Sequence, residues 1–189
     1  PNNANGYPDK AETDGVIGKI TYSWNPNEDL MYYVTWSEGF RPGLLNRPAG
    51  TQNASKTYTI PAVTDTDEVT NYEFGWKATL MDGSMRFNGS VFMSDITGIQ
   101  STIFDAAIVN LFFSDNAADA KITGVEGDFI YLTDNDWMLS GAFSLLDTEL
   151  SKSLVPTNDI VEGSELAFAP GYQFNLAARK EWSLSLIHI

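Results

Sequence analysis

Hydrophobic and polar residues alternate with a period of two along most of the chain. Between Tyr72 and Leu80, aromatic and aliphatic side chains occupy every second position. The positions between them hold Glu73, Gly75, Lys77 and Thr79. Successive side chains of a β-strand point to opposite faces, so this pattern predicts a strand with one apolar and one polar face. No long segment shows helical spacing, and the chain is therefore predicted to be all-β.

The strands are predicted to pair as antiparallel hairpins. Asp82-Gly83 favours a type I′ turn, whose two-residue loop would connect Tyr72–Leu80 to a returning strand that begins at Met85. Apolar residues then face one another, as Leu80 with Met85, Ala78 with Phe87, Trp76 with Gly89 and Phe74 with Val91. The same alternation predicts strands at 18–25, 30–36, 125–131, 137–145 and 172–182.

The connections between these strands differ in length. Short turns follow Asn25, Met81 and Leu132, whereas long polar links are predicted from Gly39 to about Asp67, from about Phe104 to Ala118 and from Glu149 to about Phe168. Strict alternation of short and long connections is typical of transmembrane barrels. Aromatic residues near both strand ends would fit two interfacial girdles, although a soluble β protein could hold them in its core. The charged face could line a lumen or meet bulk water, and the pattern alone leaves both open.

Composition excludes several classes of protein. The formal net charge is −14, which opposes binding to nucleic acid because phosphate recognition needs clustered Lys and Arg. No apolar run approaches the roughly 20 residues of a membrane helix. Cysteine is absent, so disulfides, thiolate chemistry and zinc-thiolate sites are excluded together.

No catalytic, cofactor-binding or metal-binding residue is predicted. The single histidine, His188, lies close to the end of the chain. Carboxylate pairs such as Glu73 with Glu126 or Asp134 with Asp136 are better explained by a solvated wall or turn, and acidic residues at 65–68 lack a calcium-loop pattern. One candidate ligand contact is Arg41, where a long link leaves a strand, although Gly39 and Gly43 give a structural role to this run as well.

Residues 29–46, 69–100, 116–129 and 168–170 form four blocks that resemble segments of TonB-dependent receptors. DLMYYVTWSEGFRPGLLN (29–46) is similar to a strand and loop of that family, and VTNYEFGWKATLMDGSMRFNGSVFMSDITGIQ (69–100) to its Tyr-Glu-x-Gly-x-Lys hairpin. NAADAKITGVEGDF (116–129) resembles its Gly-Val-Glu strand, and Phe168-Ala169-Pro170 its entry into a late strand. The blocks occur in the family's order.

The resemblance implies a partial antiparallel up-and-down transmembrane β-barrel, with seven or eight strands of the family's roughly 22. It implies a receptor without enzymatic activity in the bacterial outer membrane. Outer-membrane lipid, the TonB complex and a small ligand such as a siderophore, cobalamin or a glycan would be its partners. The plug domain and its TonB-contacting segment are expected outside this chain. A porin-like channel and a secreted carbohydrate-binding β-sandwich remain the alternatives.

The barrel portion is predicted to comprise residues 1–182. Residues 183–189 follow an abrupt end of the alternating pattern and resemble translated sequencing adapter. They are therefore expected to be a non-native tail.

Overall fold

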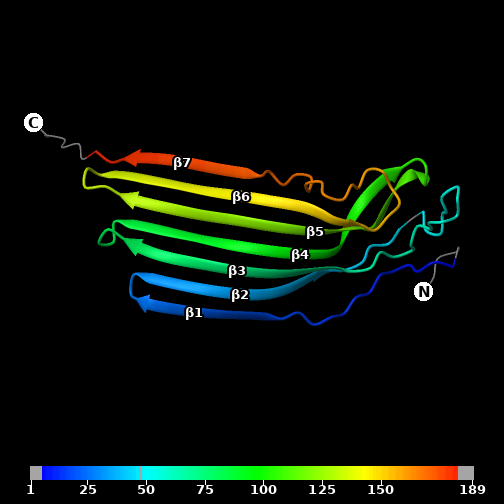
Figure 1. The fold of residues 1–189 in the computed structure, drawn as a ribbon, viewed down its shortest axis with the longest axis horizontal. Helices are drawn as coiled ribbons and strands as arrows, with labels where there is room; N and C mark the ends of the chain where they lie inside the picture. Colours follow the sequence, from blue (N-terminus) through cyan, green and yellow to red (C-terminus); the bar gives the residue numbers. More distant parts are fainter. Residues whose placement is uncertain (1–5, 47, 183–189) are drawn as a thin grey trace, which may run out of the picture.

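A computed structural model describes residues 6–46 and 48–182 of the chain. These residues form one antiparallel sheet of seven strands, and each strand pairs with its neighbours in sequence (Figure 1). The strands are β1 (Lys19–Asn27), β2 (Leu30–Arg41), β3 (Asp67–Leu80), β4 (Met85–Asp105), β5 (Val109–Leu132), β6 (Trp137–Ser153) and β7 (Tyr172–Lys180). The described residues include no helix that could span a membrane. The prediction of an all-β, up-and-down sheet is confirmed, whereas the predicted tail lies outside the described residues.

The hairpin of β3 and β4 has the predicted register but a wider turn. All four predicted pairs are present, from Leu80 with Met85 to Phe74 with Val91. The connection extends from Met81 to Ser84, so the predicted two-residue loop was too narrow, whereas Asp82 (φ 52°) and Gly83 (φ 91°) have the positive φ values that the predicted type I′ turn requires. Ser84 closes this wider turn, because its backbone N–H (3.1 Å) and its Oγ (2.7 Å) both donate to the Met81 carbonyl.

The hairpin of β4 and β5 is longer than the sequence pattern indicated. β4 continues to Asp105 and β5 begins at Val109, so the predicted long link at 104–118 is mostly strand and this prediction was wrong. Register shifts between Ile96 and Gln100 interrupt the period of two on which the prediction depended. Beyond these shifts the hairpin curls away from the sheet (Figure 1).

The other connections follow the prediction. Long links join β2 to β3 (residues 42–66) and β6 to β7 (residues 154–171). Short turns join β1 to β2, β3 to β4 and β5 to β6. The short turns lie at one end of the sheet and the long links at the other (Figure 1). We call these the short-turn end and the long-link end.

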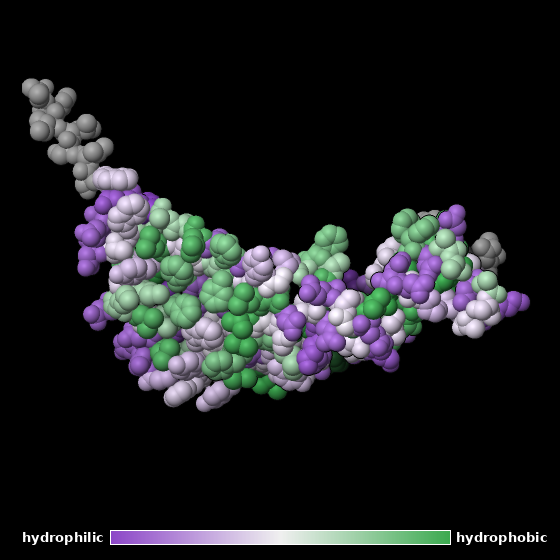
Figure 2. Space-filling view, turned by 45° about the horizontal axis from the view of Figure 1, so that its top comes forward, coloured by the Kyte–Doolittle hydropathy of each residue, from purple (hydrophilic) through white to green (hydrophobic). Residues whose placement is uncertain are grey.

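One face of the sheet is apolar and uncovered. Its exposed side chains include Ile20, Tyr22, Trp24, Val34, Phe74, Val91, Leu145, Phe174 and Leu176, which are 45% to 75% exposed. Hydrophobic side chains gather over the strands in Figure 2, and hydrophilic ones collect at the short-turn end. Soluble monomers rarely expose so large an apolar patch. The described residues form a single open sheet, without the second layer that a β-sandwich requires.

The opposite face is polar and carries charges, and we call it the charged face. Its side chains are joined across neighbouring strands. The Tyr33 hydroxyl donates to Glu73 (2.5 Å), Asn88 donates to Asp128 (3.1 Å) and Ser90 donates to Glu126 (3.4 Å). A groove of about 460 Å³ is lined in part by Tyr33, Asn88, Glu126 and Asp128. The two faces therefore differ in chemistry as the alternating sequence predicted.

Candidate functional site at the long-link end

Three segments pack together at the long-link end. They are the β2–β3 link (residues 42–66), the outer part of the β4–β5 hairpin (residues 99–118) and the start of the β6–β7 link (residues 154–160), and we call them the loop cap. A buried apolar cluster joins them, made of Ile60, Ile103, Ile108, Phe113, Ala117 and Val155, with Tyr58, Val109 and Ile160 packed against it. All three segments contribute to this cluster. The packed core of the described chain thus lies in the loop cap, while the sheet below presents its apolar face uncovered.

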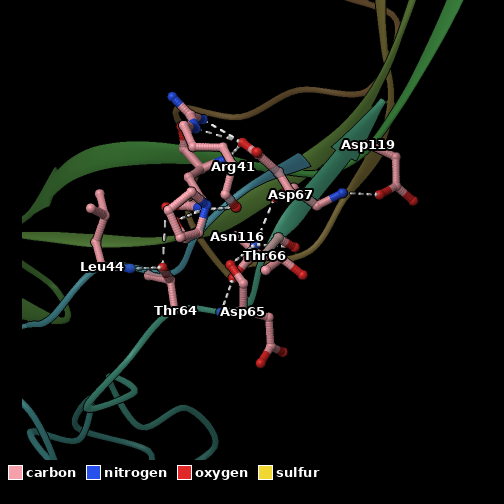
Figure 3. Close-up of polar contacts among 11 residues, drawn as sticks. Arg41, Leu44, Thr64, Asp65, Thr66, Asp67, Asn116 and Asp119 are labelled. Carbon is pink, nitrogen blue, oxygen red and sulfur yellow. Dashed lines mark hydrogen bonds and ion pairs between the residues drawn. The ribbon is translucent and has the colours of Figure 1, made fainter. Parts of the chain in front are cut away.

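Arg41 lies where β2 enters the β2–β3 link, and its guanidinium pairs with Asp67 at the start of β3 (Figure 3). Its Nε donates to Asp67 Oδ2 at 3.0 Å, and its Nη2 donates to the backbone carbonyl of Gln100 at 3.1 Å. The Asp67 side chain is only 10% exposed, whereas that of Arg41 is 55% exposed. Arg41 therefore ties β2, β3 and β4 together and still presents part of its side chain to the surroundings.

Gln100, on β4, forms further hydrogen bonds with both ends of the β2–β3 link. Its Nε2 donates to the carbonyls of Pro42 (3.0 Å) and Arg41 (3.3 Å), and its Oε1 accepts from the Thr64 hydroxyl (3.2 Å). Its backbone N–H donates to Asp67 at 3.2 Å. Gln100 and Thr64 are both buried. Because buried polar groups are costly when unpaired, this network fixes both ends of the β2–β3 link against the hairpin.

Asn46 attaches the link to the edge of β5. Its Nδ2 donates to the Ser114 carbonyl (2.6 Å) while the Ser114 N–H donates to its Oδ1 (2.7 Å). The same Nδ2 donates to the Pro61 carbonyl at 2.9 Å. The side-chain amide thus supplies the donor and acceptor that a neighbouring strand would otherwise supply.

Asn116 has a similar role at the register shift of β4. Its Nδ2 donates to the carbonyls of Gly98 (2.7 Å) and Asp65 (3.0 Å), and its Oδ1 accepts from the Asp65 N–H (2.8 Å) (Figure 3). Gly98 has a φ of +64°, a conformation that glycine adopts without steric cost. Asn116 therefore joins the irregular part of β4 to the end of the β2–β3 link.

Tyr58 connects the apolar cluster to a polar group. Its ring packs against Phe113 with the centroids 6.2 Å apart, and its hydroxyl donates to the Asp115 carboxylate. Partial burial, followed by the hydrogen bond to Asp115 and the charge of that group, raises the pKa of Tyr58 above its usual value. The hydroxyl therefore stays protonated, as a hydrogen-bond donor, well above the physiological pH range.

Three of the acidic residues considered from sequence have side-chain partners. Glu73 and Glu126 accept hydrogen bonds from Tyr33 and Ser90 on the charged face. At the long-link end, Asp67 is paired with Arg41. Residues 6–46 and 48–182 contain no group of three or more His, Cys, Asp or Glu side chains placed to hold a metal ion.

The sequence pattern indicated Arg41 as a candidate ligand contact but not the residues that hold the β2–β3 link around it. Gln100, Asn46 and Asn116 lie within the blocks that carried the family resemblance, yet no role could be given to them. Their partners are backbone groups of segments distant in sequence, so only the folded arrangement reveals them. The sequence signal that could have indicated them is an Asn or Gln beside a position where the alternating strand pattern breaks.

The geometry defines a sector of a β-barrel wall, with an apolar face, a charged face and packed loops at one end. A family model described as "TonB dependent receptor-like, beta-barrel" matches residues 1–187. The chain belongs to the TonB-dependent receptor family and contributes to its β-barrel domain.

Individual relatives agree with this assignment. The chain is 24% identical over 147 residues to "Probable TonB-dependent siderophore receptor PiuA" of Acinetobacter baumannii, covering 78% of this chain and 19% of that protein. It is similar in fold to the ferric yersiniabactin uptake receptor FyuA of Yersinia pestis, with a TM-score of 0.63, 17% identity, and 87% and 22% of the two chains covered. The solved PiuA structure gives a TM-score of 0.59, 17% identity, and 86% and 23% covered. The chain therefore spans about a fifth of these relatives.

Proposed function

We propose that this chain is part of an outer-membrane receptor that imports a scarce nutrient, such as a ferric siderophore, without catalysing a reaction. The observation that carries the proposal is the apolar face, where residues such as Leu176 (75% exposed) and Tyr22 (69% exposed) have no protein layer over them. Lipid acyl chains would cover this face in a bacterial outer membrane. The charged face would then line the interior of the barrel.

The two ends of the sheet suggest an orientation. Outer-membrane barrels have short periplasmic turns and longer extracellular loops. We therefore place the short-turn end at the periplasm and the loop cap at the cell surface, where the ligand arrives. A plug domain inside the barrel would meet the charged face, and the TonB complex would act on the receptor through the plug. Membership of the family supports these proposed partners.

Transport is tested in the bacterium that carries the intact receptor. Deletion of the receptor gene should abolish uptake of one radiolabelled ferric siderophore from a panel under iron limitation, and re-expression should restore it. A protonophore should abolish the same uptake. Cobalamin and labelled glycans serve as alternative cargoes in the panel. Receptor-dependent uptake that continues at full rate without a proton motive force would instead indicate a diffusion channel.

Ligand contact by Arg41 is part of the proposal, and it can be separated from the structural role. Arg41→Ala removes the guanidinium, whereas Asp67→Asn breaks the same ion pair and leaves the guanidinium in place. If Arg41 contacts the ligand, Arg41→Ala should weaken binding by about tenfold, equivalent to about 1.4 kcal/mol, and Asp67→Asn should have less than about half of that effect. Equal losses of affinity in the two variants, measured by titration calorimetry on the intact receptor, would leave Arg41 with a structural role alone.

A further inference from the structure

We infer that the loop cap folds and opens as one cooperative unit, in which the β2–β3 link and the β4–β5 hairpin each depend on the other. The inference goes beyond the proposed function and holds for any nutrient. Its consequence is that this part of the receptor presents a preformed surface, since no single segment of the loop cap can rearrange alone.

The β2–β3 link folds back on itself through backbone hydrogen bonds, such as Thr64 N–H to the Leu44 carbonyl (2.9 Å) and Gly50 N–H to the Ile60 carbonyl (2.9 Å), but it has no apolar core of its own. Its regular backbone pairing consists of isolated bridges between Leu45 and Val63 and between Gln52 and Thr59. Fixing so long a link costs conformational entropy that burial must offset. Its most buried side chain, Ile60, is 1% exposed and belongs to a cluster whose other members come from the hairpin and the β6–β7 link. The link therefore loses its core when the hairpin moves away.

The outer part of the β4–β5 hairpin in turn depends on the link. A two-stranded ribbon is marginally stable in water unless another element covers one of its faces. Ile103 (5% exposed) and Phe113 (2% exposed) are buried in the same cluster as Ile60. The Ala117 carbonyl accepts a hydrogen bond from the N–H of Leu154 at 2.9 Å, which joins the third segment to β5. The hairpin thus relies on both links for its burial and for its outer hydrogen bonds.

The base of the hairpin is also fixed. The Gly98 N–H donates to the Asp119 carboxylate at 2.8 Å, and the Gly98 carbonyl accepts from Asn116 at 2.7 Å. Since Asn116 also bonds to Asp65, the register shift and the end of the link are held by one side chain. Opening the hairpin at its base therefore requires release of the link.

Hydrogen exchange on the intact receptor, reconstituted without ligand, tests this coupling. Ile60→Ala leaves a cavity in the link and changes no residue of the hairpin. Amide exchange should rise by roughly a hundredfold in the link, the outer hairpin and residues 154–160 together, because Ile→Ala in a packed core has an effect of that order. A rise confined to the link, with hairpin protection as in the wild type, would overturn the inference.

Two further variants complete the experiment. Leu111→Ala truncates a side chain of the same hairpin that is 58% exposed, so it should leave exchange in the link unchanged. Asn46→Ala keeps the apolar cluster and removes the amide that bonds to Ser114 and Pro61. If Ile60→Ala prevents assembly of the receptor, Asn46→Ala should still give a smaller rise in both the link and the hairpin. A rise in only one of them counts against the inference in the same way.

Discussion

Val91→Arg is expected to destabilise the folded receptor by about 2–4 kcal/mol, the range for a basic side chain placed on the lipid face of a barrel near the bilayer midplane. Val91 lies on the apolar face of β4, is 46% exposed, and pairs with Phe74 and Val125 in the neighbouring strands. The guanidinium would have to stay in hydrocarbon or distort the bilayer to reach water. Equilibrium unfolding in urea, with the intact receptor in lipid vesicles, measures the loss.

Asn88→Arg is the matched control, since Asn88 lies on the charged face of the same strand and donates to Asp128. An arginine there would meet Asp128 and Glu126 in a groove that water can reach. We expect a change in stability below about 1 kcal/mol, as for an exposed ion pair. If both variants lost the same stability, the apolar face would not be in contact with lipid and the proposed function would fail.

Gly43→Ala is expected to destabilise the loop cap by about 1–3 kcal/mol, as overpacking does in a close-packed region. A Cβ at Gly43 would lie 2.0 Å from the backbone carbonyl oxygen of Thr64. Thr64 cannot retreat easily, because its N–H bonds to the Leu44 carbonyl (2.9 Å) and its hydroxyl accepts from the Leu44 N–H (2.8 Å). Limited proteolysis of the intact receptor should show faster cleavage within the β2–β3 link.

Gly39→Ala provides the comparison within the same run of sequence. Its Cβ would approach only the Cγ1 of Val69, at 3.1 Å, and a side-chain methyl can shift more easily than backbone. Cleavage of the link should therefore stay close to the wild-type rate. Equal sensitivity of the two glycine variants would show that the contact with Thr64 does not control the link.

Most of the sheet could be predicted from sequence, because the alternation that defines a strand lies within a few consecutive residues. Alternation of side chains identified the strands, and matching the apolar sets of β3 and β4 was enough to give their register from Leu80–Met85 to Phe74–Val91. The turn was less predictable. Asp82-Gly83 indicated where the chain reverses but not the width of the turn, in which Met81 also adopts a positive φ (53°) and Ser84 donates to the Met81 carbonyl.

The loop cap could not be predicted because its determinants are distant in sequence. The link at 104–118 was expected to be irregular since polar residues follow Phe113, yet Ser114 and Asn116 lie in a strand that Asn46 and the β4 backbone complete. Arg41 was placed correctly at the start of a link. Its pairing with Asp67 depends on the register of β2 and β3, which pairs these two residues directly.

The outermost strands of the sheet constrain the parts of the receptor that adjoin it. β1 and β7 each have one neighbour in the described chain, so their remaining N–H and C=O groups need partners from flanking strands. In the proposed barrel such strands would run antiparallel to β1 and β7, and their apolar positions would fall in phase with Ile20 and Tyr22 on one side and Phe174 and Leu176 on the other. The unpaired backbone groups and apolar side chains of β1 and β7 thus define the alternating pattern that a flanking strand would need.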